Sequence, residues 1–440
     1  MKYRWSMAPP QPALASVLAK TLGLSPLLAQ CLLNRGLSEP EPIRRFLDPR
    51  LQQLADPFLL PQMEAAVARL FRARQDQERL VIFGDYDVDG VTSTALLYEV
   101  LTALGWQVDY YLPHRLDEGY GLSQDGVENC LAKFKTTLLL AVDCGSTAVD
   151  SIAWLRERNV DAIVLDHHQV SDPAPGAVAL VNPQLAPPEV PSFRELCSVG
   201  LAFKLAHALV KHGRTTGLPG ALEYDLRPLL DLVALGTIAD VVPVTRENRI
   251  LVNTGLHWLN QTTRPGILAL KEVAQITRPM AGYEVGFQLS PRLNAAGRLE
   301  NALQALHLLL ARNLEEALPL AHALDAQNRE RQTIERGISE EAVGAVRARF
   351  NPATDYAIVE GQPLWHIGVV GIVASRVLQT FYRPTIILGG DGELWRGSGR
   401  SIEGFDLAAA LRACGDLLVR HGGHAMAAGL SIRPDKVDEF

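Results

Sequence analysis

Cysteines are scarce in this sequence, and they show no paired spacing. The five are Cys31, Cys130, Cys144, Cys197 and Cys414. A scattered and odd-numbered set argues against a disulfide framework or a zinc knuckle. Such a chain suits a reducing compartment, so we expect it in the cytoplasm.

Long hydrophobic runs are also missing. No apolar stretch approaches the roughly 20 residues that a membrane-crossing helix needs, and residues 1–10 lack the basic and apolar regions of a signal peptide. We therefore expect no membrane association. Hydrophobic residues nevertheless make up 48% of the 440 residues, which predicts more than one core and two or three domains.

Positive charge is in deficit, because the formal net charge is −7. This counts against a histone-like DNA-binding protein, whose affinity rests on bulk positive charge. It does not exclude a nuclease, because acidic side chains that bind cations lower the net charge. Of the 42 basic residues 34 are Arg, a bias that suits phosphate recognition but that GC-rich coding explains better.

Short apolar strands alternate with helices in the first half of the chain. Apolar spacing predicts helices at 14–22, 27–33 and 61–77. Four strands follow at 80–83, 108–112, 137–142 and 162–165, with helices at 92–104 and 151–158. This alternation predicts an α/β fold with an open, mainly parallel sheet covered on both faces.

The second half is helical and then returns to an α/β pattern. Residues 196–260 and 301–349 are mainly helical, and Pro319 either breaks the second stretch or lies in a first turn. Strands at 357–359 and 385–388 flank a helix at 370–378, before a glycine-rich run near Gly397–Gly399. We divide the chain into a helical segment (1–50), a catalytic domain (51–310), a connecting helix (311–350) and a smaller domain (351–440). The last domain is expected to be truncated, because the sequence stops within an element.

Three acids follow the first strand. Asp85, Asp87 and Asp89 lie within the segment Gly84–Gly90. Side chains two apart on an extended strand share a face, about 6.6 Å apart, so these carboxylates converge if the segment stays extended. Together they repel one another unless a cation holds them. The alternative interpretation is a solvated acidic loop.

Other predicted strands end in acids too. Asp143 follows one strand and Asp166-His167-His168 follows the next, while Asp240 interrupts an apolar stretch. A single such Asp is commonly a turn or helix-cap residue. Several at the carboxyl edge of one sheet, where α/β proteins bind ligands, favour a metal site. Mixed oxygen and nitrogen ligands suit Mn²⁺ or Mg²⁺, and their number suggests two ions.

The ordered set of Asp87-Val88-Asp89-Gly90, Asp143, Asp166-His167-His168 and Asp240 resembles the four motifs of the DHH phosphoesterase superfamily. Several superfamily members have a His where this chain has Phe83. The Gly-Asp-Tyr-Asp form found here is similar to the RecJ family. Further stretches resemble that family: 113–115 with 118–122, 291–298, 366–376, 398–401 and 422–424.

The resemblance implies roles for individual residues. Asp85, Asp87, Asp89, Asp143, His167 and Asp240 would ligate two ions, with Asp143 bridging them. The catalytic set would be Asp87, Asp89, Asp143, His167 and His168. His167 and His168 point in different directions on a regular strand, so we expect different roles, with His168 orienting a ligand or contacting phosphate. Phosphate would be bound by Arg115, Arg298, Arg400 and His424, helped by Ser398 or Ser401. Arg292 shares the motif of Arg298, and we favour Arg298.

The resemblance also implies an architecture and an activity. The architecture is a DHH domain and a DHHA1 substrate-binding domain, joined by a long helix and facing each other across a cleft. The activity is a single-stranded-DNA-specific 5′→3′ exonuclease that releases 5′-mononucleotides in DNA repair and recombination. Single-strand binding protein and repair helicases are the implied partners. Two alternatives stay open: a small-substrate DHH phosphodiesterase, and a non-catalytic DHH scaffold.

Overall fold

The computed structural model describes residues 6–115, 117–119, 121–187, 193–390, 392 and 394–440. Tyr120, part of one family-like motif, lies outside the described residues. Contacts between residues divide the chain into two units. The first comprises Met1–Ser290 and Ala305–Leu318, and the second comprises Pro291–Gln304 and Pro319–Phe440. Each contains its own α/β sheet, as the sequence predicts.

A parallel five-stranded sheet in the order β2-β1-β3-β4-β5 forms the centre of the first unit. Its strands are β1 (Arg79–Gly84), β2 (Gln107–Tyr111), β3 (Leu138–Val142), β4 (Asp161–Leu165) and β5 (Ala179–Val181). The central strand β3 is buried at every position, because helices cover both faces of the sheet. The first four strands were predicted, whereas β5 has only three residues and gives a weak sequence signal.

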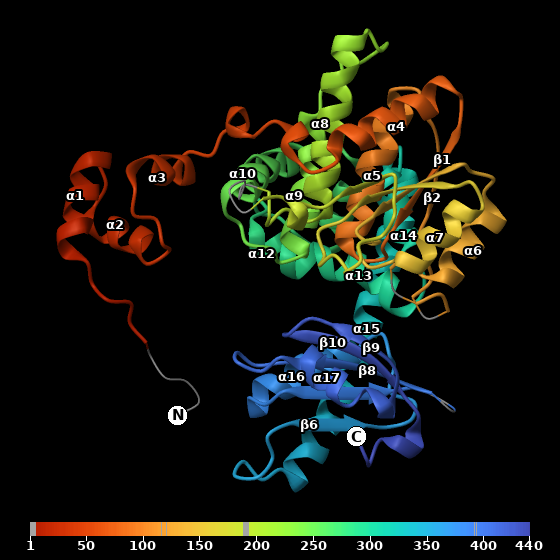
Figure 1. The fold of residues 1–440 in the computed structure, drawn as a ribbon. Helices are drawn as coiled ribbons and strands as arrows, with labels where there is room; N and C mark the ends of the chain where they lie inside the picture. Colours follow the sequence, from red (N-terminus) through yellow and green to blue (C-terminus); the bar gives the residue numbers. More distant parts are fainter. Residues whose placement is uncertain (1–5, 116, 120, 188–192, 391, 393) are drawn as a thin grey trace. The chain divides into compact units, whose positions relative to one another are not determined.

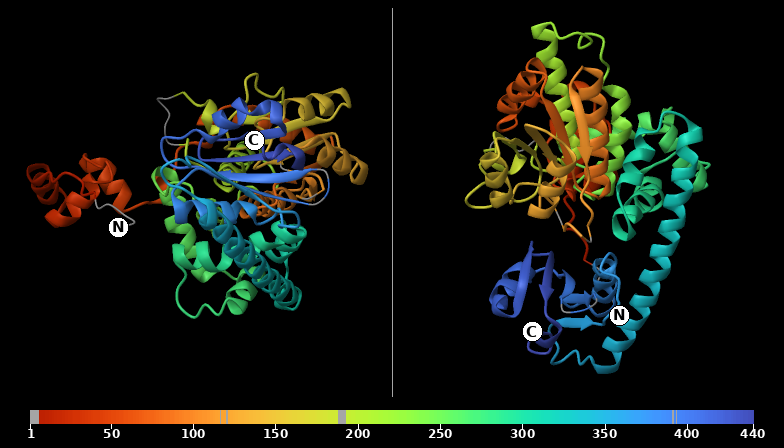
Figure 2. Two further views of the ribbon diagram at one scale, coloured as in Figure 1. Left: turned by 90° about the horizontal axis from the view of Figure 1, so that it is seen from below. Right: turned by 90° about the vertical axis from the view of Figure 1, so that its right-hand side faces the viewer.

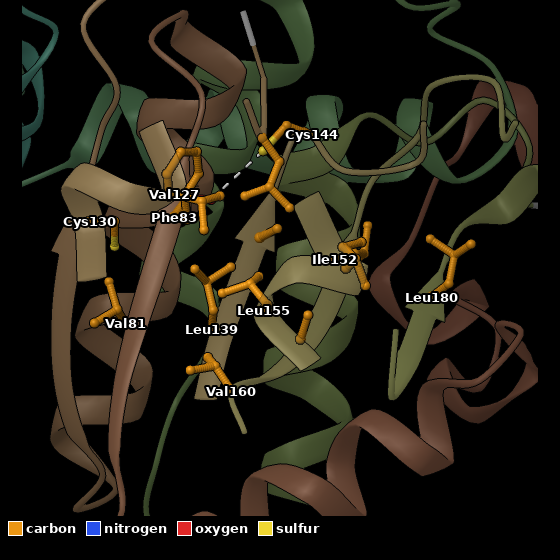
Figure 3. Close-up of a cluster of buried hydrophobic side chains, with 14 residues drawn as sticks. Val81, Phe83, Val127, Cys130, Leu139, Cys144, Ile152, Leu155, Val160 and Leu180 are labelled. Atoms are coloured by element: carbon orange, nitrogen blue, oxygen red, sulfur yellow. Dashed lines mark hydrogen bonds between the residues drawn. The ribbon is translucent and has the colours of Figure 1, made fainter. Parts of the chain in front are cut away.

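Helices lie on both faces of this sheet (Figure 1). One face carries α4 (Met63–Gln75), α5 (Val88–Ala103) and α8 (Ser198–Thr216), and the other carries α6 (Gln124–Lys133) and α7 (Val149–Glu157). Figure 3 shows the core on the second face, where Val127 and Cys130 of α6 and Ile152 and Leu155 of α7 pack on β1 and β3. This packing fixes the carboxyl ends of the strands, where the acids lie.

The remaining elements of the first unit are helical. They are α1 (Pro12–Leu22), α2 (Pro26–Leu33), α3 (Pro40–Leu47), η1 (Leu51–Gln53), η2 (Pro57–Leu59), η3 (Pro183–Leu185), η4 (Arg227–Leu229), α9 (Leu230–Ala239), α10 (Arg246–Gln261), α11 (Pro265–Val273), α12 (Gly282–Glu284), the π-helix η5 (Val285–Leu289) and α14 (Leu303–Leu310). Among the described residues no single helix is long and apolar enough to span a membrane; the bent pair α1 and α2 meets that test together, by length and composition alone.

The second unit contains a mixed sheet in the order β6-β7-β8-β10-β9. Its elements are α13 (Ser290–Leu299), α15 (Leu314–Arg349), β6 (Ile358–Gly361), α16 (Val370–Phe381), β7 (Thr385–Gly389), β8 (Trp395–Arg400), α17 (Leu407–Ala413), η6 (Gly415–Leu417), β9 (Leu418–Gly423), β10 (Ala427–Ile432) and η7 (Pro434–Lys436). Pro319 lies inside α15 and does not break it, and Figure 2 shows α15 as a continuous helix.

The glycine-rich run of the second unit is a strand, which the sequence pattern did not predict. Gly397 and Gly399 lie in β8, between β7 and β10. A Cβ on Gly397 would lie 2.5 Å from a methyl of Leu388, and one on Gly399 would lie 2.5 Å from a methyl of Leu407. Glycine therefore allows neighbouring side chains to close over this strand.

Candidate metal centre

The acidic segment after β1 turns directly into a helix. Asp87 is the N-cap of α5, and its Oδ1 accepts hydrogen bonds from the backbone N–H groups of Asp89 at 2.9 Å and Gly90 at 3.1 Å. The segment does not stay extended, so the condition under which we expected the three acids to converge along one strand face is not met. The N-cap preference of Asp, which satisfies free N–H groups at a helix start, outweighs strand continuation here.

The tertiary structure nevertheless gathers the predicted residues, together with Cys197, which was not predicted, into three groups. Within each group, potential ligand atoms lie within 4.8 Å of one another. The groups are Asp85, Asp87 and Asp143; Asp143, His167 and His168; and Asp89, Cys197 and Asp240. Asp143 is common to two of them.

Asp143 occupies a constrained position at the end of β3. Its backbone φ is 62°, a left-handed conformation that is uncommon outside glycine, and its side chain is buried. The Ser198 hydroxyl donates to Asp143 Oδ1 at 2.9 Å, and His167 Nε2 lies 3.6 Å from the same oxygen. His167 Nε2 is also 3.7 Å from Asp240 Oδ2. These nitrogen and oxygen atoms lie close enough together to be ligands of a shared cation.

Asp89, in the first turn of α5, contacts the N-terminus of α8. Its two carboxylate oxygens accept hydrogen bonds from the backbone N–H groups of Ser198 at 2.7 Å and Val199 at 2.8 Å. Free N–H groups and the helix dipole favour a carboxylate there, but burial, and then the charge of Asp87, still raise the pKa of Asp89 to about 7. Asp89 thus joins α5 to α8, in addition to lying beside Asp240.

His167 and His168 differ in their surroundings. The Nδ1 of His168 lies 2.8 Å from Asp166 Oδ1, and the other Asp166 oxygen accepts from the Ser146 N–H at 2.9 Å. Burial disfavours a charged imidazole, but the bond to Asp166 outweighs it and raises the pKa of His168 to about 9. Burial likewise acts to raise the pKa of Asp166, yet the hydrogen bonds from His168 and Ser146 hold it below the usual range.

Three further carboxyl groups have raised pKa values, and a bound cation would favour their charged forms. Burial, and then the charge of Asp87, raises the pKa of Asp85 to about 8. Burial and neighbouring carboxylates raise the pKa of Asp143 well above its usual range, and burial and Asp89 raise the pKa of Asp240 to about 8. The buried Asp85 Oδ1 has no hydrogen-bond partner within the described part of the chain. Buried, mutually repelling carboxylates with an imidazole among them fit divalent cations.

A loop after β2 brings Arg115 to the same edge. Its guanidinium lies 5.1 Å from the centre of the Tyr86 ring, and its charge acts on Asp85. The buried Glu118 holds this loop, because its carboxylate accepts from the Tyr111 hydroxyl, the His114 N–H at 2.5 Å and Asn129 Nδ2 at 2.5 Å. Glu118 therefore fixes the backbone that carries Arg115.

The other predicted phosphate-binding residues lie in the second unit. Arg400 Nη1 donates to the Ser398 hydroxyl at 3.0 Å, and a Cβ on Gly371, in the first turn of α16, would lie 2.9 Å from that hydroxyl. Arg298 Nη1 donates to the Gly368 carbonyl at 3.2 Å, just before α16. Arg298, Ser398 and Arg400 thus surround the start of this helix.

Three further residues of the second unit are placed differently. His424 is exposed beyond the end of β9, and its backbone N–H donates to the Ala427 carbonyl at 2.8 Å. Ser401 is buried and donates to the Phe405 carbonyl at 2.7 Å. Arg292 forms an ion pair with the buried Asp325 at 2.8 Å.

Two family models match the chain in the same order as its two sheets. The DHH family, N-terminal domain, matches residues 79–237, and the DHHA1 domain matches residues 354–440. The single-stranded-DNA-specific exonuclease RecJ of Escherichia coli is 40% identical over 433 residues, which cover 95% of this chain and 74% of that protein. This chain belongs to the RecJ family.

Other RecJ proteins cover the chain as fully. RecJ of Bacillus subtilis is 40% identical over 445 residues, covering all of this chain and 54% of the relative. The chain thus spans about half to three quarters of the length of these relatives. Crystal structures agree: RecJ bound to manganese superposes with a TM-score of 0.74 at 36% identity, covering 88% of this chain and 93% of that one. Thermus thermophilus RecJ in complex with Mn²⁺ has a TM-score of 0.83 at 33% identity, covering 98% and 60%.

Several residues of this chain that support the acids were not predicted from the sequence. Ser198 contacts both Asp89 and Asp143, while Ser146 binds Asp166. Asn182 Nδ2 in turn donates to the Ser146 hydroxyl and the His168 carbonyl at 2.8 Å each. The available signal was weak: Ser198 opens a helical stretch, and Asn182 follows a short apolar run. Polar residues in these positions are ordinary capping residues unless their long-range partners are known.

Proposed function

We propose that this chain is the catalytic part of a metal-dependent exonuclease that hydrolyses single-stranded DNA from the 5′ end and releases 5′-mononucleotides. The observation that carries the proposal is the convergence of buried acids and His167 around Asp143, in a chain of the RecJ family. We infer a role in DNA repair and recombination, in the cytoplasm, with single-strand binding protein and repair helicases as partners.

We propose Mn²⁺ or Mg²⁺ as the cofactor, as two ions. Asp85, Asp87, Asp143, His167 and Asp240 would hold them, and Asp143 would bridge them because it belongs to two of the groups. Asp89 would complete the set from its place against the N-terminus of α8. Two bound divalent cations would supply an activated water and neutralise charge on the phosphate under attack.

The side chains around this centre act on the phosphate and its surroundings. We propose that His168, kept protonated by Asp166, holds a phosphate oxygen with the Nε2 N–H, since Nδ1 faces the Asp166 carboxylate. Arg115 adds a second cation on the same edge, positioned by Tyr86 and by the loop that Glu118 fixes.

Polarity would come from the second unit. We propose that Arg298, Ser398 and Arg400, grouped at the start of α16, bind the terminal 5′-phosphate. A helix start and forked guanidinium groups both favour a phosphate dianion. His424, exposed beyond β9, would contact the strand beside that phosphate. From the sequence pattern we propose four domains: the helical segment 1–50, the catalytic domain 51–310, the connecting helix 311–350 and the substrate-binding domain 351–440. Arg298 lies within the proposed catalytic domain by sequence, although it belongs to the second unit by its contacts.

Digestion of end-labelled oligonucleotides tests this function. Single- and double-stranded DNA of both polarities would be incubated with Mn²⁺, Mg²⁺ or a chelator. We expect mononucleotides from the 5′ end of single strands alone, with no product under chelation. Turnover confined to very short oligonucleotides would favour the small-substrate alternative, and a lack of any hydrolysis would favour the scaffold.

Two variants sharpen the metal assignment. Asp143→Ala should abolish hydrolysis while retaining a folded protein by circular dichroism. Asp150→Ala removes an exposed acid from the first turn of α7 and should cleave like the parent chain. Unchanged cleavage by Asp143→Ala would refute the metal assignment.

A further inference from the structure

Tyr283 and Phe287 form an exposed, stacked aromatic pair in the first unit. Their ring centroids are 5.2 Å apart with an interplanar angle of 29°. The two residues are 58% and 72% exposed, whereas every other described aromatic residue of this unit is buried or half-buried. Two stacked, solvent-exposed rings form a flat apolar surface. Contiguous apolar surfaces mark interaction sites more often than single scattered apolar residues do.

The segment that carries the pair is well anchored. Val285 and Leu289 of the π-helix η5 are buried below it, and the buried Glu284 side chain accepts from the Ala281 N–H at 2.9 Å. A π-helical turn is rare and occurs frequently at functional sites. The rings are therefore presented by a fixed backbone, so little conformational entropy is lost when they bind a ligand.

The segment that carries the pair contacts α9, the helix that ends at one predicted metal ligand. A Cβ on Gly286, adjacent to Phe287, would lie 3.7 Å from a methyl of Ile238 in the last turn of α9. Asp240, a predicted metal ligand, is the C-cap of that helix. The segment that carries the two rings therefore packs against the helix end that carries Asp240.

A cation accompanies the aromatic rings. The Arg278 guanidinium lies 6.0 Å from the centre of the Tyr283 ring and forms an ion pair with Glu284 at 2.5 Å. Flat apolar rings match the base of a nucleotide, which can stack on them. Because the Glu284 carboxylate offsets the charge of Arg278, the rings and not this cation carry the match.

We propose that Tyr283 and Phe287 stack against a base of the bound DNA single strand, close to the phosphate that is hydrolysed. This inference rests on the proposed function and adds a specific contact surface to it. Stacking on aromatic rings tolerates any base, because each base has a π-face. The surface would therefore hold the strand without imposing a sequence preference.

Binding measurements test the proposal without relying on hydrolysis. Fluorescence anisotropy would follow a 5′-phosphorylated, labelled 20-mer binding to the Asp143→Ala protein, with and without Phe287→Ala or Tyr283→Ala. We expect Phe287→Ala to weaken binding at least about fivefold, the lower limit for one base stack. Phe287→Trp should retain affinity, whereas Phe287→Leu, which keeps apolar bulk but no ring, should lose it.

An abasic site moved along the oligonucleotide locates the contact. At one position the abasic site should weaken binding to the Asp143→Ala protein. At that position, adding Phe287→Ala should cause no further loss of affinity. The control is Leu222→Ala, which removes a side chain that is 69% exposed in the loop beyond the far end of α8 and should leave affinity unchanged.

The outcomes separate this inference from the function on which it rests. If the parent chain degrades single strands and Phe287→Ala binds them equally well, the stacking surface is refuted and the nuclease stands. If Phe287→Ala changes the oligomeric state measured by light scattering and not DNA affinity, the rings contact a second copy and the proposal is also wrong. A parent chain without nuclease activity refutes the proposed function, whatever the affinities.

Discussion

At the scale of single residues, the candidate centre contains groups whose conformation or charge is unfavourable in the metal-free folded chain. Asp143 has a left-handed backbone conformation, which costs a non-glycine residue about 1–3 kcal/mol. Its neighbours Asp85 and Asp240 are carboxyl groups whose pKa burial raises. Cation binding offsets both costs, so stability and metal should be coupled.

We expect the metal-free protein to lose stability as the pH rises. The pKa of Asp85 is raised to about 8 in the folded chain, against about 3.9 when unfolded. Between these two values the unfolded chain has released the proton that the folded chain still binds. The contribution of Asp85 to the free energy of unfolding is therefore fully present below about pH 4 and is lost as the pH rises towards 8. Bound Mn²⁺ replaces that proton. Thermal unfolding should therefore show a larger gain in Tm from Mn²⁺ at pH 8 than at pH 5; an equal or smaller gain at pH 8 would contradict this.

Glu118 is expected to be a positioning residue for Arg115. Glu118→Ala leaves the Tyr111 hydroxyl, the His114 N–H and Asn129 without their acceptor, a loss of about 2–3 kcal/mol in the free energy of unfolding. The loop carrying Arg115 should become more mobile in this variant. We therefore expect KM for single-stranded DNA to increase several-fold, and kcat to decrease by a smaller factor. Urea unfolding and steady-state kinetics measure the two effects.

The matched control for that loop is Glu128→Ala. Glu128 is exposed on α6 and accepts only from Gln124 among the described contacts, so its loss should change neither quantity. A Glu118→Ala protein with reduced stability and unchanged KM would show a structural role alone.

At the scale of elements, the local pattern predicted strands and helices but not how they join. The spacing of Asp85, Asp87 and Asp89 suggested one extended face, whereas α5 begins at Val88 and rotates Asp89 towards α8. Asp at an N-cap was a recognisable signal in Gly84–Gly90 that favoured an early helix start. The partner helix α8 begins 109 residues after Asp89, and no local pattern indicates that pairing.

Gly90→Ala should disrupt the junction between β1 and α5. A Cβ at Gly90 would lie 2.6 Å from the Asp85 carbonyl oxygen and 2.8 Å from its Cα, and both belong to backbone that has little freedom to move. We expect a loss of more than about 2 kcal/mol of stability and weaker Mn²⁺ binding, measured by thermal unfolding and calorimetry.

Gly344→Ala provides the comparison for that substitution. A Cβ at Gly344 in α15 meets nothing within 4 Å, so the exchange should stabilise the protein by about 0.5–1 kcal/mol. If Gly90→Ala stabilised the protein to the same degree, the close approach to Asp85 would not be a constraint.

At the scale of the whole molecule, the chain forms two units, and the predicted metal ligands all belong to the first. The predicted phosphate-binding residues divide, with Arg115 in the first unit and Arg298, Ser398, Arg400 and His424 in the second. Metal binding should therefore protect one unit selectively, because a ligand stabilises the structure to which it binds.

Hydrogen exchange followed by mass spectrometry measures that selectivity. Mn²⁺ should slow exchange in β1, the start of α5 and the end of α9, and should leave β7, β8 and β10 unchanged. The Asp143→Ala protein should show no such protection. Equal protection of both sheets by Mn²⁺ would contradict an assignment of all ligands to the first unit.

The sequence by itself determined the α/β class, the first four parallel strands and the ordered acids and histidines that identify the family, because strand periodicity and acids at strand ends are local patterns. Only the tertiary structure decided that Asp89 binds the start of α8, that Ser198 contacts Asp143, and that Pro291–Gln304 joins the second unit. These contacts link residues tens to more than a hundred positions apart. Their energies come from burial and from hydrogen bonds between distant segments, and such terms exist only once the chain has folded.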